Sequence, residues 1–252
     1  MNLIFSNSLR DGRMRRTVTL AALAALTIPL TMFGQANARC APDNAGVKLP
    51  PGFCAEIYAD SIPGVRHMVF APNGDLFVSR QGRGGGVMAL RETNHSGHPD
   101  VRRQIATGYT TSEVALFDGY LYTEARPMGG GRGAPAPVIA ILRYPMKPGD
   151  LTPTGPPDTI VAGLPGGGNH TTRNFAITSA GVMYVNLGSA TNSCQETDRT
   201  KGSVGKNPCA ELDTRAGVWM FDARKKNQMQ GTAVHFAKGI RNAVGIAISP
   251  LD

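Results

Sequence analysis

The sequence has few charged residues and no basic block. Asp, Glu, Lys and Arg make up 17% of the 252 residues, while hydrophobic residues make up 41%. So little charge excludes a charge-rich disordered chain, and the hydrophobic share is sufficient for a sizeable core. Because no cluster of Lys and Arg is interleaved with aromatic residues, the sequence also argues against nucleic-acid binding.

Several motifs of known chemistry are missing as well. The chain has no CxxC or Cys/His zinc pattern, no Gly-x-Ser-x-Gly elbow and no His-Glu-x-x-His motif. Glycine runs at 84–86 and 129–131 lack the Lys-Ser/Thr ending of a phosphate loop, so we interpret them as ordinary loops. Beyond residue 38, no stretch is apolar enough to span a membrane.

Glycine and proline, in contrast, are abundant. The 31 Gly and 18 Pro are 49 of 252 residues, about 19% of the chain. With normal hydrophobicity, this composition predicts many short elements joined by turns, as in all-β folds. Long helical bundles are disfavoured.

Residues 1–38 are typical of a secretory signal peptide. Four arginines come first: Arg10, Arg13, Arg15 and Arg16. An apolar run at 18–33 follows, and Ala36-Asn37-Ala38 matches a cleavage pattern. The run is short for a membrane-spanning helix. We therefore predict cleavage after Ala38, a mature domain over 39–252, no stable membrane insertion and a periplasmic or secreted location.

The four cysteines agree with export. Cys40 and Cys54 are 14 residues apart, and Cys194 and Cys209 are 15 apart. Four cysteines permit three pairings, of which two local loops, Cys40–Cys54 and Cys194–Cys209, are the simplest. Four free buried thiols are the alternative.

A repeated pattern runs through the mature part, in which an alternating apolar strand, a turn and a second strand follow one another. Three copies cover residues 68–78, 114–122 and 175–185. A fourth begins at Val244 and would turn at Asp252. Asn-Gly and Asp-Gly turns between such runs are strong hairpin signals. Apolar runs at 86–90, 138–144 and 217–221 would supply a third strand to each repeat.

The spacing of the turns, 45, 62 and about 71 residues, predicts a β-propeller with loop insertions. About three and a half to four blades are present, fewer than a closed ring needs. A hairpin opened but not completed would leave backbone groups unpaired. We therefore interpret the chain as the N-terminal part of a longer protein.

In a propeller, the residues just before each first strand converge on the axis at one face. Here these entries are 64–67, 111–113, 168–173 and 239–242. They carry Arg, His, Glu and Asn, where a purely structural repeat more often has small or apolar residues. We therefore expect the functional site at this face.

The sequence resembles the glucose/sorbosone dehydrogenase family, and within it the sorbosone-dehydrogenase-like branch. The resemblance covers roughly residues 49–252 and rests on four segments, 49–53, 71–76, 167–170 and 239–242. Gly167-Gly168-Asn169-His170 and Gly239-Ile240-Arg241-Asn242 are its specific part. The resemblance implies an all-β, six-bladed propeller in the full-length protein. It also implies oxidation of an aldose or sorbosone-type sugar at C1 by hydride transfer to pyrroloquinoline quinone (PQQ).

The resemblance also implies roles for three residues. His170 would be the catalytic base, since an imidazole accepts a proton near neutral pH. Arg241 and Asn242 would bind PQQ, whose carboxylates and quinone carbonyls suit a guanidinium and an amide. The structural alternatives are a loop-capping role for His170 and an ion pair for Arg241. Calcium is implied too, but no metal ligand here can be assigned, and the expected electron acceptor is a cytochrome or quinone.

The sequence departs from the glucose-oxidising members in two places. Gly188 is followed by Ser189 rather than an acidic residue, which puts glucose itself in doubt as the substrate. Ser112-Glu113 enters the second blade, where the family more often has an amide or imidazole. Arg66 and His67 either reach the channel or lie on the surface.

Two other functions remain open at this stage. A calcium-dependent sugar lactonase would need several acidic or amide side chains at the inner-strand entries, and only Glu113 and Asn242 fit. A non-catalytic propeller that binds a protein or glycan would not need His170.

Overall fold

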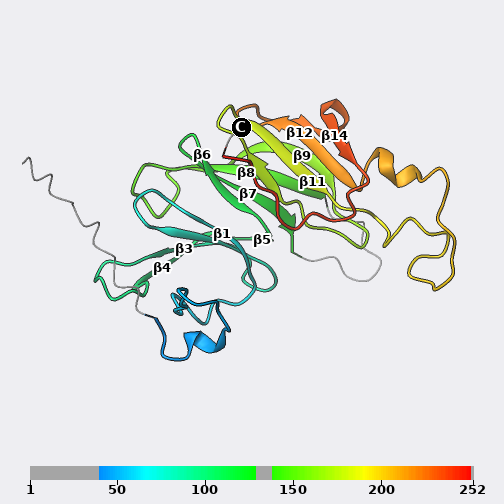
Figure 1. Ribbon diagram of the computed structural model, residues 1–252. Helices are drawn as coiled ribbons and strands as arrows, with labels where there is room; N and C mark the ends of the chain where they lie inside the picture. The colour runs from blue at the N-terminus through cyan, green and yellow to red at the C-terminus, as the bar shows by residue number, and fades with distance from the viewer. Residues whose placement is uncertain (1–39, 129–137, 251–252) are drawn as a thin grey trace, which may run out of the picture. The chain divides into compact units, whose positions relative to one another are not determined.

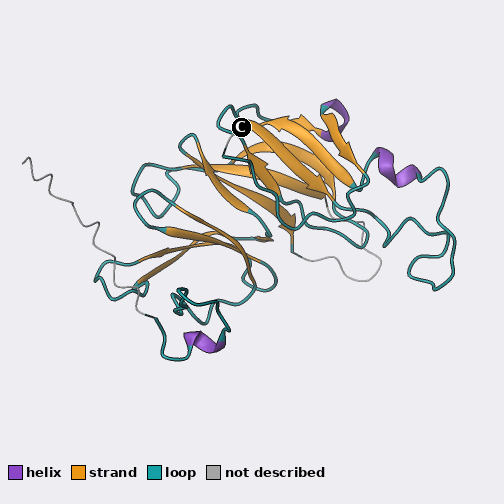
Figure 2. Cartoon of the chain, viewed as in Figure 1, coloured by secondary structure: helices purple, strands orange, loops and turns teal. Residues whose placement is uncertain are grey.

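The computed structural model describes residues 40–128 and 138–250, so the predicted signal peptide and the glycine run at 129–131 lie outside the described residues. Strands dominate (Figures 1 and 2). Three short 3-10 helices accompany them: η1 (Asn44–Gly46), η2 (Ala210–Asp213) and η3 (Gln230–Thr232). Within the described ranges, no helix is long and apolar enough to cross a membrane.

The first sheet, blade 1, is a meander of four antiparallel strands in sequence order. Its strands are β1 (Val65–Phe70), β2 (Leu76–Arg80), β3 (Gly86–Arg91) and β4 (Val101–Ala106). The β1–β2 turn contains Asn73-Gly74, and Gly74 has a φ of +89°, a left-handed conformation that glycine adopts without a steric penalty. The hairpin predicted over 68–78 is therefore confirmed.

Blade 2 repeats this meander and gains two further short strands. Its four main strands are β6 (Val114–Phe117), β7 (Tyr120–Pro127), β8 (Val138–Pro145) and β9 (Asp158–Pro165). β5 (Tyr109–Thr110) pairs with β7, and β13 (Gln228–Met229) pairs in parallel with β9. The β6–β7 hairpin and the third strand at 138–144 were both predicted from the sequence.

Blade 3 consists of β10 (Phe175–Ile177), β11 (Val182–Leu187), β12 (Gly217–Asp222) and β14 (Val234–Lys238). A loop over residues 188–216 separates β11 from β12. The second hairpin strand of each blade pairs with the predicted third strand, so all three third-strand predictions are confirmed.

The first strands of the three blades are neighbours, since β6 lies against both β1 and β10. Apolar clusters fill the spaces between blades. Phe77, Val87 and Leu121 belong to the cluster between blades 1 and 2, whereas Tyr122, Leu187 and Trp219 belong to that between blades 2 and 3. Four-stranded meanders packed face to face around adjacent inner strands form a β-propeller, as predicted.

Two further predictions have different outcomes. Both predicted disulfides, Cys40–Cys54 and Cys194–Cys209, are present. The predicted fourth first strand is wrong in the described part of the chain, because residues 244–250 form no strand. A first strand is held by the second strand of its own hairpin, and residues 40–128 and 138–250 contain no such partner for Val244.

His235 on β14 stacks on Trp219 in the core of blade 3, with ring centroids 3.8 Å apart and planes 13° apart. Its Nε2 is buried and has no hydrogen-bond partner among the described residues. Gly217 makes room for the ring, since a Cβ there would lie 2.6 Å from Nε2. Burial lowers the pKa of His235, and the nearby Lys238 lowers it further, against smaller opposing effects of a backbone hydrogen bond with Ala237 and of the Asp213 charge.

We expect the free energy of unfolding to fall as the pH drops below about 6.5, the pKa of an unfolded histidine. The unfolded chain then binds a proton that folded His235 resists, so folding is penalised by about 1.4 kcal/mol per unit of pKa difference. Denaturant titrations followed by the fluorescence of Trp219, the one tryptophan of the sequence, measure this. His235→Phe keeps a stacked ring and should remove this part of the pH dependence; an unchanged dependence would contradict the assignment.

Candidate functional site

The predicted site residues lie at the end of the blades where the first strands begin. His170 lies in the loop before β10, Ser189 follows β11, and Arg241 and Asn242 follow β14. Backbone hydrogen bonds tie these segments together: Asn169 N donates to Ala190 O at 2.8 Å, and Ser189 N donates to Arg241 O at 2.7 Å. The structure therefore brings the two specific sequence motifs side by side.

His170 is buried, at 8% exposure, and its Nδ1 lies 2.8 Å from Ser189 Oγ and 3.0 Å from Ser189 O. Ser189 Oγ donates its hydrogen to Thr191 O at 2.7 Å. Both Ser189 oxygens can therefore only accept from the ring, so in neutral His170 the proton resides on Nδ1. Nε2 is then the basic nitrogen.

Gly188 allows this close approach. A Cβ at Gly188 would lie 2.6 Å from His170 Cβ, 3.0 Å from Asn242 Oδ1 and 3.3 Å from Arg241 O. Real side chains do not tolerate such contacts, so only glycine lets the His170 loop and residues 241–242 pack on the end of β11.

Two arginines hold the backbone of the His170 loop. Arg215 donates through Nη2 to His170 O at 2.9 Å, through Nη1 to Gly167 O at 2.9 Å and through Nε to Gly188 O at 2.6 Å. Arg173 donates to His170 O at 3.0 Å, to Thr172 O at 2.7 Å and to Pro165 O.

These arginines make the site electropositive. Burial lowers the pKa of Arg173 to about 9, assisted by the charge of Arg215, and burial also lowers the pKa of Arg215. Neither guanidinium forms an ion pair with a carboxylate anywhere in residues 40–128 and 138–250. The charges of Glu124 and Glu211 act on Arg173 and Arg215, respectively, without direct contact, and so offset their positive charge only in part. Buried positive charge that is only partly offset favours an anionic ligand.

Arg241 and Asn242 differ in their surroundings. Arg241 is exposed, and its guanidinium donates to the backbone and side-chain oxygens of Asn192 at 2.7 and 2.5 Å. Asn242 is half-buried beside Gly188, and its Oδ1 is buried with no hydrogen-bond partner among the described residues. Asn186 Oδ1 accepts from Ala243 N at 3.2 Å, while its Nδ2 likewise has no partner there.

A second polar cluster lies at the entries of all three inner strands. His67 Nδ1 lies 2.9 Å from Glu113 Oε2, and Asn174 Nδ2 donates to the same oxygen at 3.1 Å. Burial raises the pKa of Glu113, although the Asn174 amide and the His67 charge act in the opposite direction. Arg66, the neighbour of His67, is exposed.

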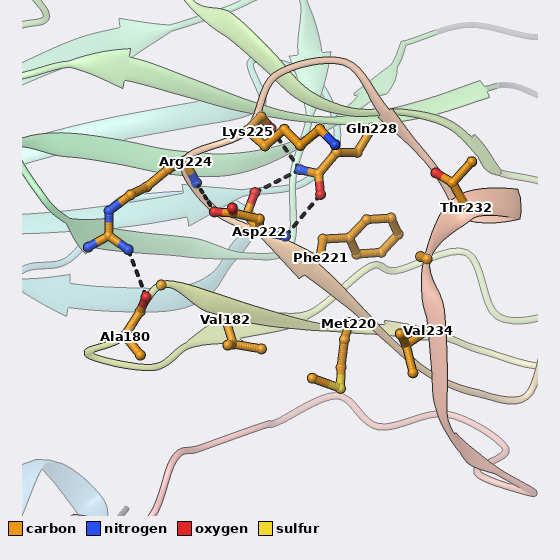
Figure 3. A pocket seen from close by; sticks show the side chains of 12 residues that line it. Ala180, Val182, Met220, Phe221, Asp222, Arg224, Lys225, Gln228, Thr232 and Val234 are labelled. Carbon is orange, nitrogen blue, oxygen red and sulfur yellow. Dashed lines mark hydrogen bonds between the residues drawn. The ribbon is translucent and has the colours of Figure 1, made fainter.

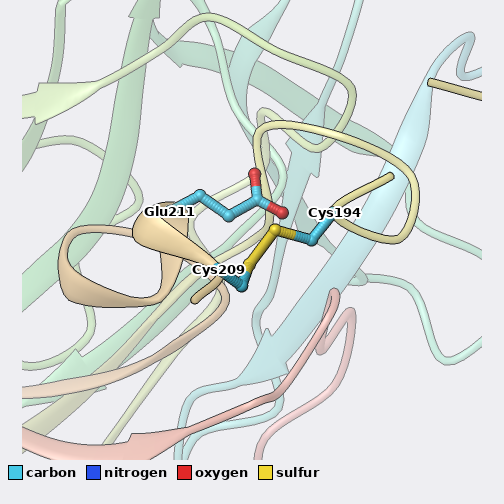
Figure 4. A group of neighbouring side chains, drawn as sticks. All are labelled: Cys194, Cys209 and Glu211. Atoms are coloured by element: carbon cyan, nitrogen blue, oxygen red, sulfur yellow. A yellow bond between two sulfur atoms is a disulfide. The ribbon is translucent and has the colours of Figure 1, made fainter. Parts of the chain in front are cut away.

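A Cys–Glu group in the 188–216 loop is a brace and not a metal site (Figure 4). Its sulfurs, from Cys194 and Cys209, form a disulfide and offer no thiolate. The carboxylate of Glu211 accepts hydrogen bonds from Ala190 N, Thr191 N and Thr191 Oγ1 at 2.8 to 2.9 Å. This brace fixes the loop that carries Ser189.

Two hollows lie at the opposite end of the blades and contain none of the predicted site residues. One of about 410 Å³ lies beside the β10–β11 turn, where Gln228 holds the backbone of Asp222 and Lys225 (Figure 3). Another, of about 350 Å³, lies between the first turns of blades 1 and 2. Neither contains a histidine, so we place the chemistry at the His170 face.

The fold is an all-β propeller. At the face where the first strands begin, the tautomer of the buried His170 is fixed by Ser189, and Arg173 and Arg215 hold the backbone of its loop. The chain belongs to the family described as TrAA12-like, whose model matches residues 47–252. The match covers nearly the same residues as the resemblance found in the sequence. The model that matches is not one of the sorbosone branch, so that narrower placement is not supported.

Solved structures are similar at low identity. A calcium structure of the Trichoderma reesei Carbohydrate-Active Enzymes Family AA12 protein matches with a TM-score of 0.51 and 16% identity, over 70% of this chain and 41% of that chain. The holo form of the pyranose dehydrogenase PQQ domain from Coprinopsis cinerea matches with a TM-score of 0.48 and 17% identity, over 68% of this chain and 37% of that chain. This chain thus spans about two fifths of these solved chains. No curated protein matches.

Proposed function

We propose that this chain carries part of the active site of a PQQ-dependent sugar oxidoreductase, with His170 as the general base. The observation that carries the proposal is the fixed tautomer of His170, which leaves Nε2 as the basic nitrogen, in a loop whose backbone oxygen at His170 accepts from two buried arginines. Membership of the TrAA12-like family supports it, as does the similarity to the calcium structure of the Family AA12 protein.

The residues present fit PQQ, an anion with three carboxylates. Arg173 and Arg215 supply positive charge, and Asn186 Nδ2 is a buried donor without a described partner. Arg241 and Asn242 would hold the cofactor, which requires Arg241 to exchange its Asn192 contacts for a carboxylate. When bound, PQQ supplies the acceptor for the hydride that leaves the sugar.

His170 would accept the proton of the anomeric hydroxyl on Nε2. As the C1–H and O–H bonds break and the carbonyl forms, the imidazole becomes positively charged. Ser189 O and Oγ already accept from Nδ1–H and so stabilise that charge without reorganisation.

The finer features of the proposal rest on the sequence. The substrate is an aldose or sorbosone-type sugar oxidised at C1, the acceptor is a cytochrome or quinone, and the location is periplasmic or secreted. Two disulfides fit an exported protein. Calcium remains a predicted cofactor, and no described side chain is assigned to it.

Dye reduction by the chain, incubated with PQQ and calcium and given aldohexoses, tests the proposal. We expect reduction that needs both sugar and PQQ, and bound PQQ should alter the fluorescence of Trp219. Hydrolysis of a sugar lactone with calcium alone would instead support the lactonase alternative. Sugar or protein binding that survives His170→Ala, with no PQQ binding, would support a non-catalytic module.

A further inference from the structure

Residues from the starts of all three inner strands are joined by hydrogen bonds to one carboxylate, that of Glu113. His67 lies in β1, Glu113 directly precedes β6, and Asn174 directly precedes β10. His67 Nδ1 and Asn174 Nδ2 lie 2.9 and 3.1 Å from Glu113 Oε2, and Val114 N donates to Oε1 at 3.1 Å. The carboxylate is almost fully buried, with an 8% exposed side chain, whereas that of His67 is 31% exposed.

This arrangement defines the tautomer of His67. Both oxygens of Glu113 accept N–H groups, from Val114 and Asn174, which is the pattern expected of an ionised carboxylate. Nδ1 of His67 is therefore the donor to Glu113. Nε2 is then the ring nitrogen that Glu113 does not use, on a side chain that is 31% exposed, in the manner of carboxylate–histidine pairs that present the far nitrogen to a ligand.

The strand is locally distorted to place this ring. The β1–β2 register shifts between Val65 and Met68, so His67 lies in a β-bulge. Ser79 Oγ satisfies both backbone hydrogen-bonding groups of His67: it accepts from His67 N at 2.9 Å and donates to His67 O at 3.1 Å. Bulges of this kind redirect side chains next to functional sites. A simple bridge between blades 1 and 2 would not need a histidine side chain that is 31% exposed.

We propose that Glu113 orients His67 to bind a sugar hydroxyl through Nε2. The ligand class follows from the contrast between the two parts of the entry face. Arg173 and Arg215 suit an anion, whereas a single imidazole nitrogen pairs with a neutral group such as a hydroxyl, which can donate or accept one hydrogen bond. The identity of that group as a sugar hydroxyl rests on the proposed function.

The test is an NMR titration of the PQQ-free chain, with ¹⁵N-labelled histidine, against D-glucose, D-mannose and D-galactose. We expect at least one sugar to shift the Nε2 resonance of His67, while exposed His95 serves as an internal reference. The sugar should bind about tenfold more weakly to Glu113→Gln, equivalent to about 1.4 kcal/mol. Glu124→Gln is the matched control, because it neutralises a neighbouring buried carboxylate that contacts Ser112 and not His67.

His67→Gln keeps a donor to Glu113 but removes Nε2 from its position, so it should fold and lose the sugar-dependent shifts of nearby amides. If Glu113→Gln does not fold, His67→Gln alone tests whether His67 binds the sugar through Nε2. The inference is overturned if no sugar shifts His67, or if Glu113→Gln and Glu124→Gln weaken binding equally. PQQ-dependent oxidation with an unshifted His67 refutes only this inference. A shifted His67 without PQQ binding refutes only the proposed function.

Discussion

Replacing His170 with alanine is expected to lower kcat of PQQ-dependent sugar oxidation by about 100- to 10,000-fold, the usual contribution of a general base. The variant removes the one imidazole whose Nδ1–H is fixed by Ser189, and no described neighbour can take its place within the same loop. Dye reduction under saturating sugar measures kcat, and PQQ binding followed by Trp219 fluorescence should be nearly unchanged.

The control for this variant is His98→Ala. His98 is an exposed histidine in the loop between β3 and β4, far along the sequence from the site, and its replacement should leave kcat within about twofold. Retention of full activity by His170→Ala would remove it from the mechanism.

Gly188→Ala is expected to lower activity by about 100-fold, because a displacement of the base by about 1 Å has that effect on catalysis. The new Cβ would lie 2.6 Å from His170 Cβ and 3.0 Å from Asn242 Oδ1, so both proposed site residues must move. Overpacking should also lower the free energy of unfolding by about 1–3 kcal/mol.

Gly205→Ala is the matched control for that substitution. Gly205 lies in the same 188–216 loop, and a Cβ there would meet nothing within 4 Å. Kinetics of the two variants, with denaturant titrations on each, separate a local displacement of the site from a general effect of alanine. Equal activities would show that His170 and residues 241–242 do not need their close packing.

The hairpins of this fold were predictable because each depends on neighbouring residues. Asn73-Gly74 and Asp118-Gly119 specify turns, and the alternating residues beside them specify strands, so local chemistry is sufficient. The prediction at Val244 used the same signals and is wrong in the described residues, since a strand also needs a partner, which a local pattern does not guarantee.

The site was predictable only in part. His170 and Asn242 carry recognisable motifs, and the structure places both beside Gly188. The Asn192 contacts of Arg241 come from a long loop whose path no sequence pattern specifies. Arg215 has no sequence signal, since its partners are backbone oxygens far along the chain. Asn174 could have been found, as it directly precedes a strand like the other entry residues.

The parallel pairing of β13 with β9 makes blade 2 depend on residues from the following blade. β9 ends at Pro165, and its outer edge is covered only when Gln228 and Met229 arrive, with Asn227 N also donating to Thr159 O at 2.9 Å. During synthesis, blade 2 therefore presents an open strand edge while more than sixty further residues are translated, at about 5–20 residues per second. For those few seconds the open edge of β9 can pair with a strand of another chain. This edge is covered only when the first three strands of blade 3 have been synthesised.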